Sequence, residues 1–530
     1  MKAGIWRGGD LDRDPLPASI DCEVCVIGAG PVGLAVARAL AERRRRVVLL
    51  EQGPRIAERQ DAAEVEFGHE AYAGATIGRA FGAGGTSTLW GGQLLPVREA
   101  DLHGRPQIGA PPWPIPFAEI ERHFPVLERW LRVVPGSYAI PRTGMPHPLA
   151  ALEWGDLAPR ISKWTPFGRR NLDVAFGSAL GASGRVRAVY RARAADWTLA
   201  AGEDGRRLAA VAVRSPGGLA MAVRANAYVL CAGALETARC ALELREAAGA
   251  APPEDAAGRY LHDHLSLRVA RVRVKDRARF HALFAPVFDG PVMRSLRMEL
   301  AEDSLAREGL PALYAHFLFE IRRDSGFGRV RDLLRGLQQG RVGEALRHAA
   351  YMPLVLPGVA EMAFERYVRR RLPFPRGADI HLQCDFEQAP TRENRVRLGE
   401  RGRDGRRKLR IDWKPEAGAD RIARAVHAAV GRLWARNGLE RIARLEPVEP
   451  EAGEVGANLH DIYHPAGTTR MSADPSDGVV DPDLRMHGLH NVYIAGSAVF
   501  PSMGAANPTF TAMALGLRLA EHLDTRLKTG

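Results

Sequence analysis

The sequence predicts an α/β fold with a second, α+β part built on an antiparallel sheet. Its 530 residues exceed the ~250–300 residues at which a single hydrophobic core stops growing, so two or three domain-sized cores are expected. Residues 24–51 have the pattern of a buried strand, a glycine turn, a helix and a second strand, which is typical of a parallel sheet covered by helices. Residues 380–413 instead contain short alternating stretches typical of antiparallel strands.

The composition is that of a folded protein, with 46% hydrophobic and 26% charged residues. The formal net charge is +12, but the excess arginines are scattered along the chain, which favours a compositional bias over a binding surface. Because no aromatic and basic platform accompanies the charge, we expect no nucleic-acid partner. The five cysteines argue against a disulfide framework, and the absence of an apolar run after the first basic residue favours a cytoplasmic protein.

The amino-terminal unit carries a full glycine signature between its first strand and its helix. Gly28 permits a tight turn, Gly30 lets the backbone approach a pyrophosphate, and Gly33 lets the helix pack on the strand. The amino end of the helix then faces the phosphates. Glu51, at the end of the second strand, is expected to accept a hydrogen bond from a ribose hydroxyl and to repel a 2′-phosphate. The unit predicts an adenine dinucleotide and leaves FAD and NAD as alternatives.

Three further segments extend this pattern. Residues 79–97 combine glycines with hydroxyl side chains, which indicates either backbone lying against a flat or anionic ligand or a glycine-rich surface loop. Residues 225–244 predict a strand that runs through a glycine turn into a helix. Near the carboxyl end, a buried strand precedes a loop over Ser502–Asn507 and a helix with Pro508 in its first turn.

Five blocks in this order resemble the glucose-methanol-choline (GMC) oxidoreductases, a family of FAD-dependent alcohol and sugar oxidoreductases. They are the G-x-G-x-x-G unit, the loop GGTSTLWGG, CAGALET, LHDHLS, and the carboxyl-terminal block that runs from YHPAGTTRM to GSAVFPSMGAANPT. Within the family, the loop and the carboxyl-terminal ending look most similar to the pyranose oxidase and glycoside 3-oxidase branch. That branch has an asparagine where many relatives have a second histidine.

The resemblance implies a discontinuous Rossmann-like FAD-binding domain formed by residues 18–103, 184–269 and 455–530. It implies a substrate-binding domain, built on an antiparallel sheet, from residues 105–183 and 271–454. In pyranose oxidases the glycine loop carries a histidine that is joined to the flavin, and the corresponding position here is Leu89, so non-covalent FAD is expected. The positions expected to contact FAD are Gly28, Gly30, Gly33, Glu51, Gly85, Thr86, Ser87, Trp90, Gly91, Ala232, Gly496, Asn507, Pro508 and Thr509.

His464 and Asn507 are the predicted catalytic residues. Oxidation of an alcohol to a carbonyl requires loss of the hydroxyl proton, and a neutral imidazole with an unperturbed pKa near ~6.5 suits that step. By the family pattern, His464 resembles the general base, and Asn507 its partner, donating or accepting a hydrogen bond that orients the substrate hydroxyl. The alternatives are a structural histidine at His464 and an N-cap at Asn507, ahead of the proline that starts the last helix.

Three other groups of residues have less specific interpretations. His262, Asp263 and His264 lack a fourth ligand at metal-site spacing, so no metal is expected, and the family resemblance implies that the block is structural. Gln383 and Glu387 either point into the substrate pocket or form cross-strand surface pairs. Residues 327–372 are basic and amphipathic, which suits a lid, a contact in a homo-oligomer or a membrane-surface segment; we favour the first two.

The leading functional hypothesis is FAD-dependent oxidation of a secondary hydroxyl of a sugar or glycoside to a ketone. Its expected partners are a small alcohol or sugar substrate and an electron acceptor, either oxygen or a quinone-like or dye-like compound. The alternative within enzymes is oxidation of a non-sugar alcohol, such as a sterol, a polyketide or another natural product, which the apolar part of residues 327–372 would suit. A flavin-binding protein without turnover is the alternative from another class; the presence of both His464 and Asn507 argues against it.

Overall fold

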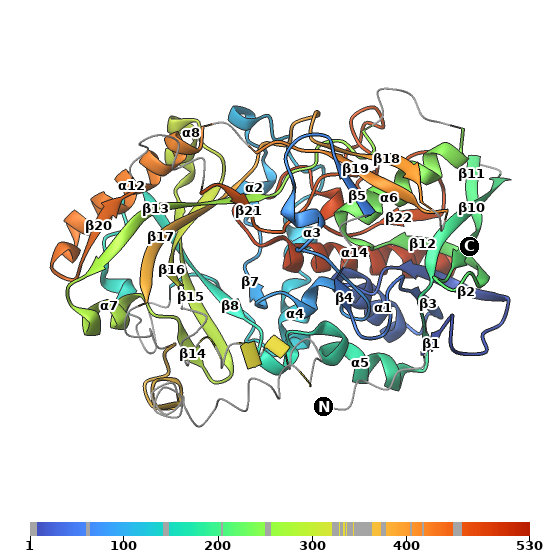
Figure 1. Ribbon diagram of the computed structural model, residues 1–530, viewed down its shortest axis with the longest axis horizontal. Helices are drawn as coiled ribbons and strands as arrows, with labels where there is room; N and C mark the ends of the chain where they lie inside the picture. Colours follow the sequence, from blue (N-terminus) through green and yellow to red (C-terminus); the bar gives the residue numbers. More distant parts are fainter. Residues whose placement is uncertain are drawn as a thin grey trace.

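The computed structural model describes most of the chain. The described residues are 8–59, 64–140, 148–202, 205–249, 256–320, 328, 332–333, 335–336, 343, 363–372, 378–402, 405–415, 418–448 and 458–529. They form two large sheets that lie side by side, one in the right half and one in the left half of the molecule (Figure 1).

The first sheet has eight strands in the order β1-β9-β3-β2-β12-β11-β10, with β22 beside β12. The pairs among β1, β9, β3, β2, β12 and β22 are parallel, whereas β10, β11 and the start of β12 pair antiparallel. The predicted discontinuous α/β fold is confirmed, because one sheet collects strands from three distant parts of the sequence. Its strands are β1 (Gly8–Asp10), β2 (Ser19–Ile27), β3 (Val47–Leu50), β9 (Val186–Tyr190), β10 (Arg193–Gly202), β11 (Gly205–Arg214), β12 (Ala220–Leu230) and β22 (Val492–Ile494).

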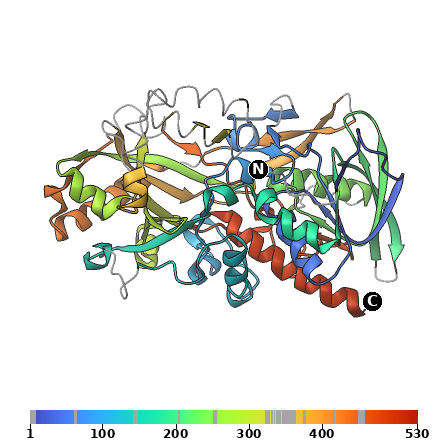
Figure 2. The same ribbon diagram turned by 90° about the horizontal axis from the view of Figure 1, so that it is seen from below.

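Helices from both ends of the chain cover this sheet. Helix α1 (Pro31–Glu42) packs against α5 (Leu172–Ser183) and against the long carboxyl-terminal helix α14 (Pro508–Thr529), which Figure 2 shows beside it. A Cβ atom at Gly516 would lie 3.0 Å from Val36 of α1, so the glycine allows the two helices to approach closely. Helix α6 (Gly233–Ala247) follows β12. The short helices are α2 (Glu99–Leu102), α3 (Ala118–Glu121), α4 (Phe124–Trp130) and α8 (Glu302–Glu308).

The second sheet has nine strands in the order β20-β13-β17-β16-β15-β8-β7, with β14 beside β15 and β21 beside β13. All of its pairs are antiparallel, which confirms the predicted antiparallel second sheet. Helices α12 (Ala419–Arg436) and α7 (Arg277–Phe284) cover one face, where Phe284, Phe317 and Trp434 pack together. The strands are β7 (Gln93–Leu94), β8 (Leu157–Trp164), β13 (His264–Val274), β14 (Val287–Asp289), β15 (Val292–Leu300), β16 (Leu313–Glu320), β17 (Asp379–Glu387), β20 (Ala443–Pro447) and β21 (His460–Asp461).

One predicted sheet is confirmed only in part. The sequence predicts that residues 380–400 and 408–413 pair as an antiparallel sheet, and β18 (Arg395–Arg401) does pair antiparallel with β19 (Arg407–Asp412), which also pairs with β5 (Val65–Phe67). The first part of the stretch is not in that sheet, because β17 has β13 and β16 on its two edges. A last pair joins β4 (Glu58–Arg59) to β6 (Ala80–Phe81). The division into domains at the boundaries given above remains our proposal.

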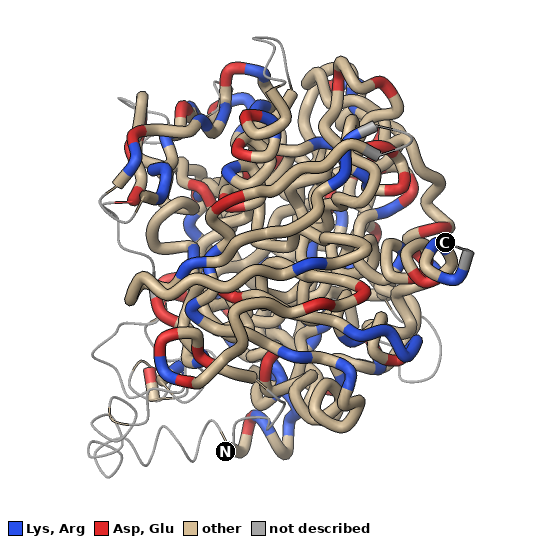
Figure 3. The backbone as a smooth tube through the Cα atoms, turned by 90° about the vertical axis from the view of Figure 1, so that its right-hand side faces the viewer, with Lys and Arg blue, Asp and Glu red and all other residues tan. Residues whose placement is uncertain are grey.

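The expected lid or contact segment, residues 327–372, lies largely outside the described residues. Its described end, residues 363–372, is joined to the second sheet by hydrogen bonds from Phe288 to Arg370 (2.7 Å) and from Leu372 to Pro286 (2.8 Å). No helix in the described part of the chain is long and apolar enough to cross a membrane. Basic and acidic residues are interspersed along the backbone tube in Figure 3, in agreement with the scattered charge of the sequence.

The middle of α12 offers a stability test. Gly431 is partly exposed, and a Cβ atom there would meet no other atom within 4 Å. Gly431→Ala is expected to stabilise the protein by about 0.5–1 kcal/mol, because alanine costs less backbone entropy in a helix. Gly438, just after the helix, has a φ of +61°, so Gly438→Ala should shift stability in the opposite direction. Urea titration of the two variants tests both signs.

Candidate active site

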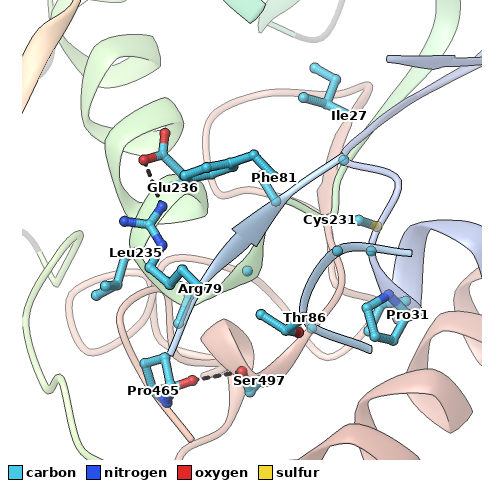
Figure 4. A pocket seen from close by; sticks show the side chains of 18 of the residues that line it. Ile27, Pro31, Arg79, Phe81, Thr86, Cys231, Leu235, Glu236, Pro465 and Ser497 are labelled. Atoms are coloured by element: carbon cyan, nitrogen blue, oxygen red, sulfur yellow. Dashed lines mark hydrogen bonds and ion pairs between the residues drawn. The ribbon is translucent and has the colours of Figure 1, made fainter. Parts of the chain in front are cut away.

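A cleft opens at the carboxyl ends of the parallel strands, where ligands of such sheets usually bind. Its lining includes the residues that end or follow four of these strands: Ile27, Leu50, Cys231 and Ala495. Figure 4 shows Pro31 and Thr86 on one side of the cleft and Arg79 and Glu236 on another. The amino-terminal motif, the glycine loop, the start of α6 and the start of α14 all contribute to it.

The three glycines of the motif have the properties that a dinucleotide requires. Gly28 has a φ of +109°, and a Cβ atom at Gly33 would lie 1.8 Å from the carbonyl oxygen of Gly28. Gly30 lines the cleft, and a Cβ atom there would meet no protein atom within 4 Å. The space beside Gly30 is therefore open at the amino end of α1, where a pyrophosphate is favoured by free amide groups and the helix dipole.

Glu51 lines the same cleft, and its carboxylate also holds neighbouring backbone in place. Its carboxylate accepts hydrogen bonds from the amides of Ala29 (2.8 Å), Gly53 (2.9 Å) and Gly82 (3.0 Å). Burial raises the pKa of the Glu51 carboxyl, and these three amides oppose the shift by favouring the charged form. Glu51 thus joins the motif to the glycine loop.

The predicted residues of the glycine loop divide into two groups. Gly85 and Thr86 line the cleft. Ser87, Trp90 and Gly91 are not among the described lining residues and instead build the loop. Ser87 donates to the carbonyl of Gly84 (2.6 Å), Trp90 Nε1 donates to that of Arg170 (2.6 Å), and Gly91 leaves room for the Trp164 ring.

The remaining predicted cofactor positions lie at helix starts and strand ends. Ala232, Gly496, Pro508 and Thr509 all line the cleft, so the amino end of α14 faces it and favours negative charge there. Asn507 is not among the lining residues. It lies immediately before α14, and its Oδ1 accepts a hydrogen bond from Gln93 Nε2 (2.6 Å).

The sequence did not single out the buried ion pair between Arg79 and Glu236, whose atoms Nη2 and Oε1 are 2.8 Å apart. Although burial opposes the charged form, Arg406, Arg239 and Arg79 hold the pKa of the Glu236 carboxyl well below its usual range. Both residues line the cleft, and Arg79 Nη1 is buried without a hydrogen-bond partner in the described structure. That orphaned donor fits a cleft that receives an anionic cofactor.

His464 lies in the lining of the cleft and is paired with a second histidine. Its Nδ1 is 3.1 Å from Nδ1 of His264, and Nε2 of His264 is 2.7 Å from the carbonyl oxygen of Gly504. A carbonyl can only accept, so His264 carries its proton on Nε2 and accepts at Nδ1. His464 must then donate from Nδ1, which leaves its Nε2 as an unprotonated acceptor.

Asp263 fixes the two histidines relative to each other. Its Oδ1 accepts from the backbone amides of His264 (2.7 Å) and His464 (2.8 Å), and its Oδ2 accepts from the hydroxyl of Tyr72. The block LHDH was interpreted as structural, and His264 was missed as a contact of the candidate base. His264 begins β13, but no pattern in the sequence indicates that it contacts His464.

The environment keeps His464 neutral. Burial, assisted by the nearby His264, lowers the pKa of His464 to about 3, while the carboxylate of Asp385 opposes the shift. A neutral imidazole with a free Nε2 is the form of histidine that can accept a proton.

The face of the second sheet opposite Phe284 and Trp434 is polar where it approaches this pair. Along it lie Ser266, Asp385 and Gln383, and the carboxylate of Asp385 accepts from Ser266 and lies 3.2 Å from His316 Nε2. Although burial opposes ionisation, His316 and hydrogen bonds from Ser266 and Tyr314 hold the pKa of Asp385 below its usual range. An ionised carboxylate therefore lies near the two histidines.

Gln383 and Glu387 are both buried, so their interpretation as surface pairs is wrong. Gln383 donates to Ser266 Oγ (2.6 Å) on the polar face. Glu387 accepts from the amides of Met503 (2.6 Å) and Gly504 (3.1 Å) and so fixes the loop whose carbonyl receives His264.

Comparison with known proteins agrees with this geometry. Residues 390–516 match the model of a family described as GMC oxidoreductase, and residues 23–75 match one described as FAD dependent oxidoreductase. The paromamine 6′-oxidase of Streptomyces fradiae is 26% identical, with 94% of this chain and 90% of that protein covered. The C-glycoside 3-oxidase of Microbacterium trichothecenolyticum is 35% identical over a shorter stretch, covering 18% of this chain and 19% of that protein.

A solved structure extends the likeness to the whole fold. Pyridoxine 4-oxidase from Mesorbium loti superposes with a TM-score of 0.53 at 19% identity, covering 94% of this chain and 99% of that one. The dinucleotide cleft, the neutral histidine in its lining and these matches lead to one assignment. Over residues 390–516 the chain matches the GMC oxidoreductases, and it is an FAD-dependent oxidoreductase that acts on CH–OH groups.

Proposed function

We propose that this enzyme oxidises a secondary hydroxyl of a sugar or glycoside to a ketone. The observation that carries the proposal is the polar face of the second sheet, where Ser266, Gln383, Asp385 and His316 lie beside the histidine pair. Most of these groups bond to one another, but Gln383 Oε1 is buried without a hydrogen-bond partner among the described residues. A hydroxyl-rich ligand supplies a donor to such an oxygen and an apolar alcohol does not, so this polar face favours a sugar over the non-sugar alternative.

The proposed roles follow from the hydrogen bonds. His464 Nε2 accepts the proton of the reacting hydroxyl, and His264 supports this by holding the proton of His464 on Nδ1. Asn507 orients the same hydroxyl. Bound FAD supplies the acceptor for the hydride that leaves the substrate carbon. The glycines of the motif, Glu51, Thr86 and the start of α14 hold the cofactor.

We propose that FAD is bound without a covalent link. Leu89, which occupies the position of the flavin-linked histidine of pyranose oxidases, has no group that could form one. The two thiols in the lining, Cys231 and Cys240, are buried, and burial raises the pKa of each. Neutral thiols are poor nucleophiles. Release of intact FAD from acid-precipitated protein tests the point, and flavin that stays with the pellet would contradict it.

An aminoglycoside hydroxyl is a second candidate. The Streptomyces relative that covers 94% of this chain is a paromamine 6′-oxidase, and an ionised Asp385 near the histidine pair would attract an amino-bearing sugar. The two candidate substrates differ in charge and in the position oxidised, so a single panel of substrates can distinguish them.

The screen measures anaerobic bleaching of the flavin by a panel of monosaccharides, O- and C-glycosides, aminoglycosides, sterols and simple alcohols. Bleaching by sugars or glycosides with a ketone product supports the proposal, whereas bleaching by aminoglycosides supports the second candidate, whose ketone or aldehyde product identifies the position oxidised. Bleaching only by sterols or other apolar alcohols would overturn it. Subsequent addition of air and then of a quinone dye identifies the electron acceptor.

A variant of His264 tests the tautomer argument. His264→Leu removes the acceptor for His464 Nδ1–H, so the imidazole is free to rotate or to carry its proton on Nε2. We expect the limiting rate of flavin bleaching to fall by up to about 100-fold, as expected for a misplaced catalytic group. His262→Gln is the control, because the His262 ring contacts the carbonyl of Tyr260 and not His464. Equal rates in both variants would contradict the pairing.

A further inference from the structure

A chain of hydrogen bonds connects the second sheet to Asn507. Arg297 of β15 donates from Nη2 to Oε1 of Gln93, which begins β7, and Gln93 Nε2 donates to Oδ1 of Asn507 (2.6 Å). Arg297 is only 7% exposed, and its Nη1 donates to the carbonyl of Leu296 (2.8 Å). Gln93 is therefore held between a guanidinium and the side chain of the predicted catalytic residue.

The guanidinium fixes the direction of the whole chain. Arginine has donors and no acceptor, so the end of the Gln93 amide that faces Arg297 must be its oxygen. The NH₂ group of Gln93 then faces Asn507, and the end of Asn507 that faces Gln93 must likewise be its oxygen. Amide orientation is usually ambiguous, but here each assignment follows from the one before it. The NH₂ group of Asn507 is left pointing away from Gln93.

We propose that Gln93, held by Arg297, is a positioning residue that makes Asn507 a hydrogen-bond donor to the oxygen of the reacting hydroxyl. This rests on the proposed function, in which that hydroxyl loses its proton to His464. The sequence alone left open whether Asn507 donates or accepts. The direction of the chain assigns it as a donor, and Gln93 was not among the residues predicted to act.

The assignment complements the histidine pair. His464 offers an acceptor because its hydrogen bonds lead through His264 to the carbonyl of Gly504. Asn507 offers a donor because its hydrogen bonds lead through Gln93 to Arg297. A hydroxyl can give its proton to the first and accept from the second at the same time. As the proton leaves, negative charge grows on the hydroxyl oxygen, and a donor already aimed there stabilises it. One series of hydrogen bonds therefore orients the proton acceptor, His464, and the other orients the donor, Asn507, that stabilises the hydroxyl oxygen.

Two variants of Gln93 separate this role from a merely structural one. Gln93→Glu keeps the size and strengthens the contact with Arg297, but a carboxylate cannot donate to Asn507 and draws the asparagine NH₂ group toward itself. Gln93→Leu removes both bonds and leaves Asn507 free to adopt either orientation. A positioning role predicts that Gln93→Glu is slower than Gln93→Leu. A structural tie between β7 and the start of α14 predicts the reverse, because Gln93→Leu loses more contacts.

The measurement is the limiting rate of anaerobic flavin bleaching, by stopped flow, with the alcohol that reduces the wild-type enzyme most rapidly. We expect Gln93→Glu to lower this rate about 10- to 100-fold, with little change in the substrate concentration for half-saturation, in the melting temperature and in the flavin spectrum. In an Asn507→Ala background, Gln93→Glu is expected to cause no further loss. Additive losses in the double variant, or Gln93→Leu as the slower single variant, would overturn the proposal.

The same experiment distinguishes failure of the proposed function. If only a non-sugar alcohol bleaches the wild-type flavin, the sugar assignment fails, and the order of the two Gln93 variants is still measured with that alcohol. If no alcohol bleaches it, no hydroxyl is activated, and both proposals are overturned.

Discussion

His464→Asn is expected to lower kcat/KM by about 10²- to 10⁴-fold, the usual contribution of a general base. The asparagine NH₂ group can still donate to His264 Nδ1, so the local geometry is retained while the basic nitrogen is lost. The pKa of His464 is lowered to about 3, so the wild-type base is neutral at pH 7 and stays so under mildly acidic conditions. Steady-state kinetics and anaerobic flavin bleaching measure the loss.

His460→Asn is the matched control. His460 lies four positions earlier on β21, and Nδ1 of its exposed ring is 2.9 Å from the carbonyl oxygen of Asn458. We expect this variant to keep the wild-type kcat/KM and both variants to keep the flavin spectrum. A His464→Asn enzyme that bleaches at the wild-type rate would assign the base to another group, with His264 the nearest candidate.

The sequence was sufficient for the parts of the fold that depend on local pattern. The amino-terminal strand, glycine turn, helix and strand follow from residues 24–51, because hydrophobic period and glycine position each specify a local geometry. Strand pairing was not local. Residues 395–401 and 407–412 do pair antiparallel, as predicted, but residues 379–387 lie between β13 and β16 in the second sheet, a placement that depends on the whole sheet.

The candidate site divides in the same way. Gly30, Thr86, His464 and Pro508 were predicted from motifs and line one cleft. Ser87 and Trp90 were predicted to contact FAD, but their side chains donate hydrogen bonds to the backbone of Gly84 and Arg170. In this loop, hydroxyl and indole groups stabilise the loop conformation itself. His264, Gln93 and Arg297 are linked to the predicted catalytic residues by contacts across about 200 positions or more of sequence, and no motif spacing indicates such contacts.

Gly30→Ala is expected to weaken FAD binding by about 1–3 kcal/mol, roughly 5- to 150-fold in Kd, without unfolding the protein. Gly30 has a φ of −76° that alanine adopts freely, and its added methyl group would meet no protein atom within 4 Å. The methyl group would instead occupy the open space at the amino end of α1. A weaker affinity for FAD would therefore come from a contact between the methyl group and the cofactor, because the methyl group contacts no protein atom.

Gly168→Ala provides the control for this substitution. Gly168 also has open space around its Cβ position and no left-handed φ, but it is not among the residues described as lining the cleft. Fluorescence titration of the two apoproteins with FAD is expected to give a raised Kd for Gly30→Ala alone, with equal melting temperatures for both apoproteins. Equal Kd values would mean that the pyrophosphate does not approach Gly30, and that the amino end of α1 has only a structural role. A lowered melting temperature in apo Gly30→Ala would show instead that the methyl group disturbs the fold itself.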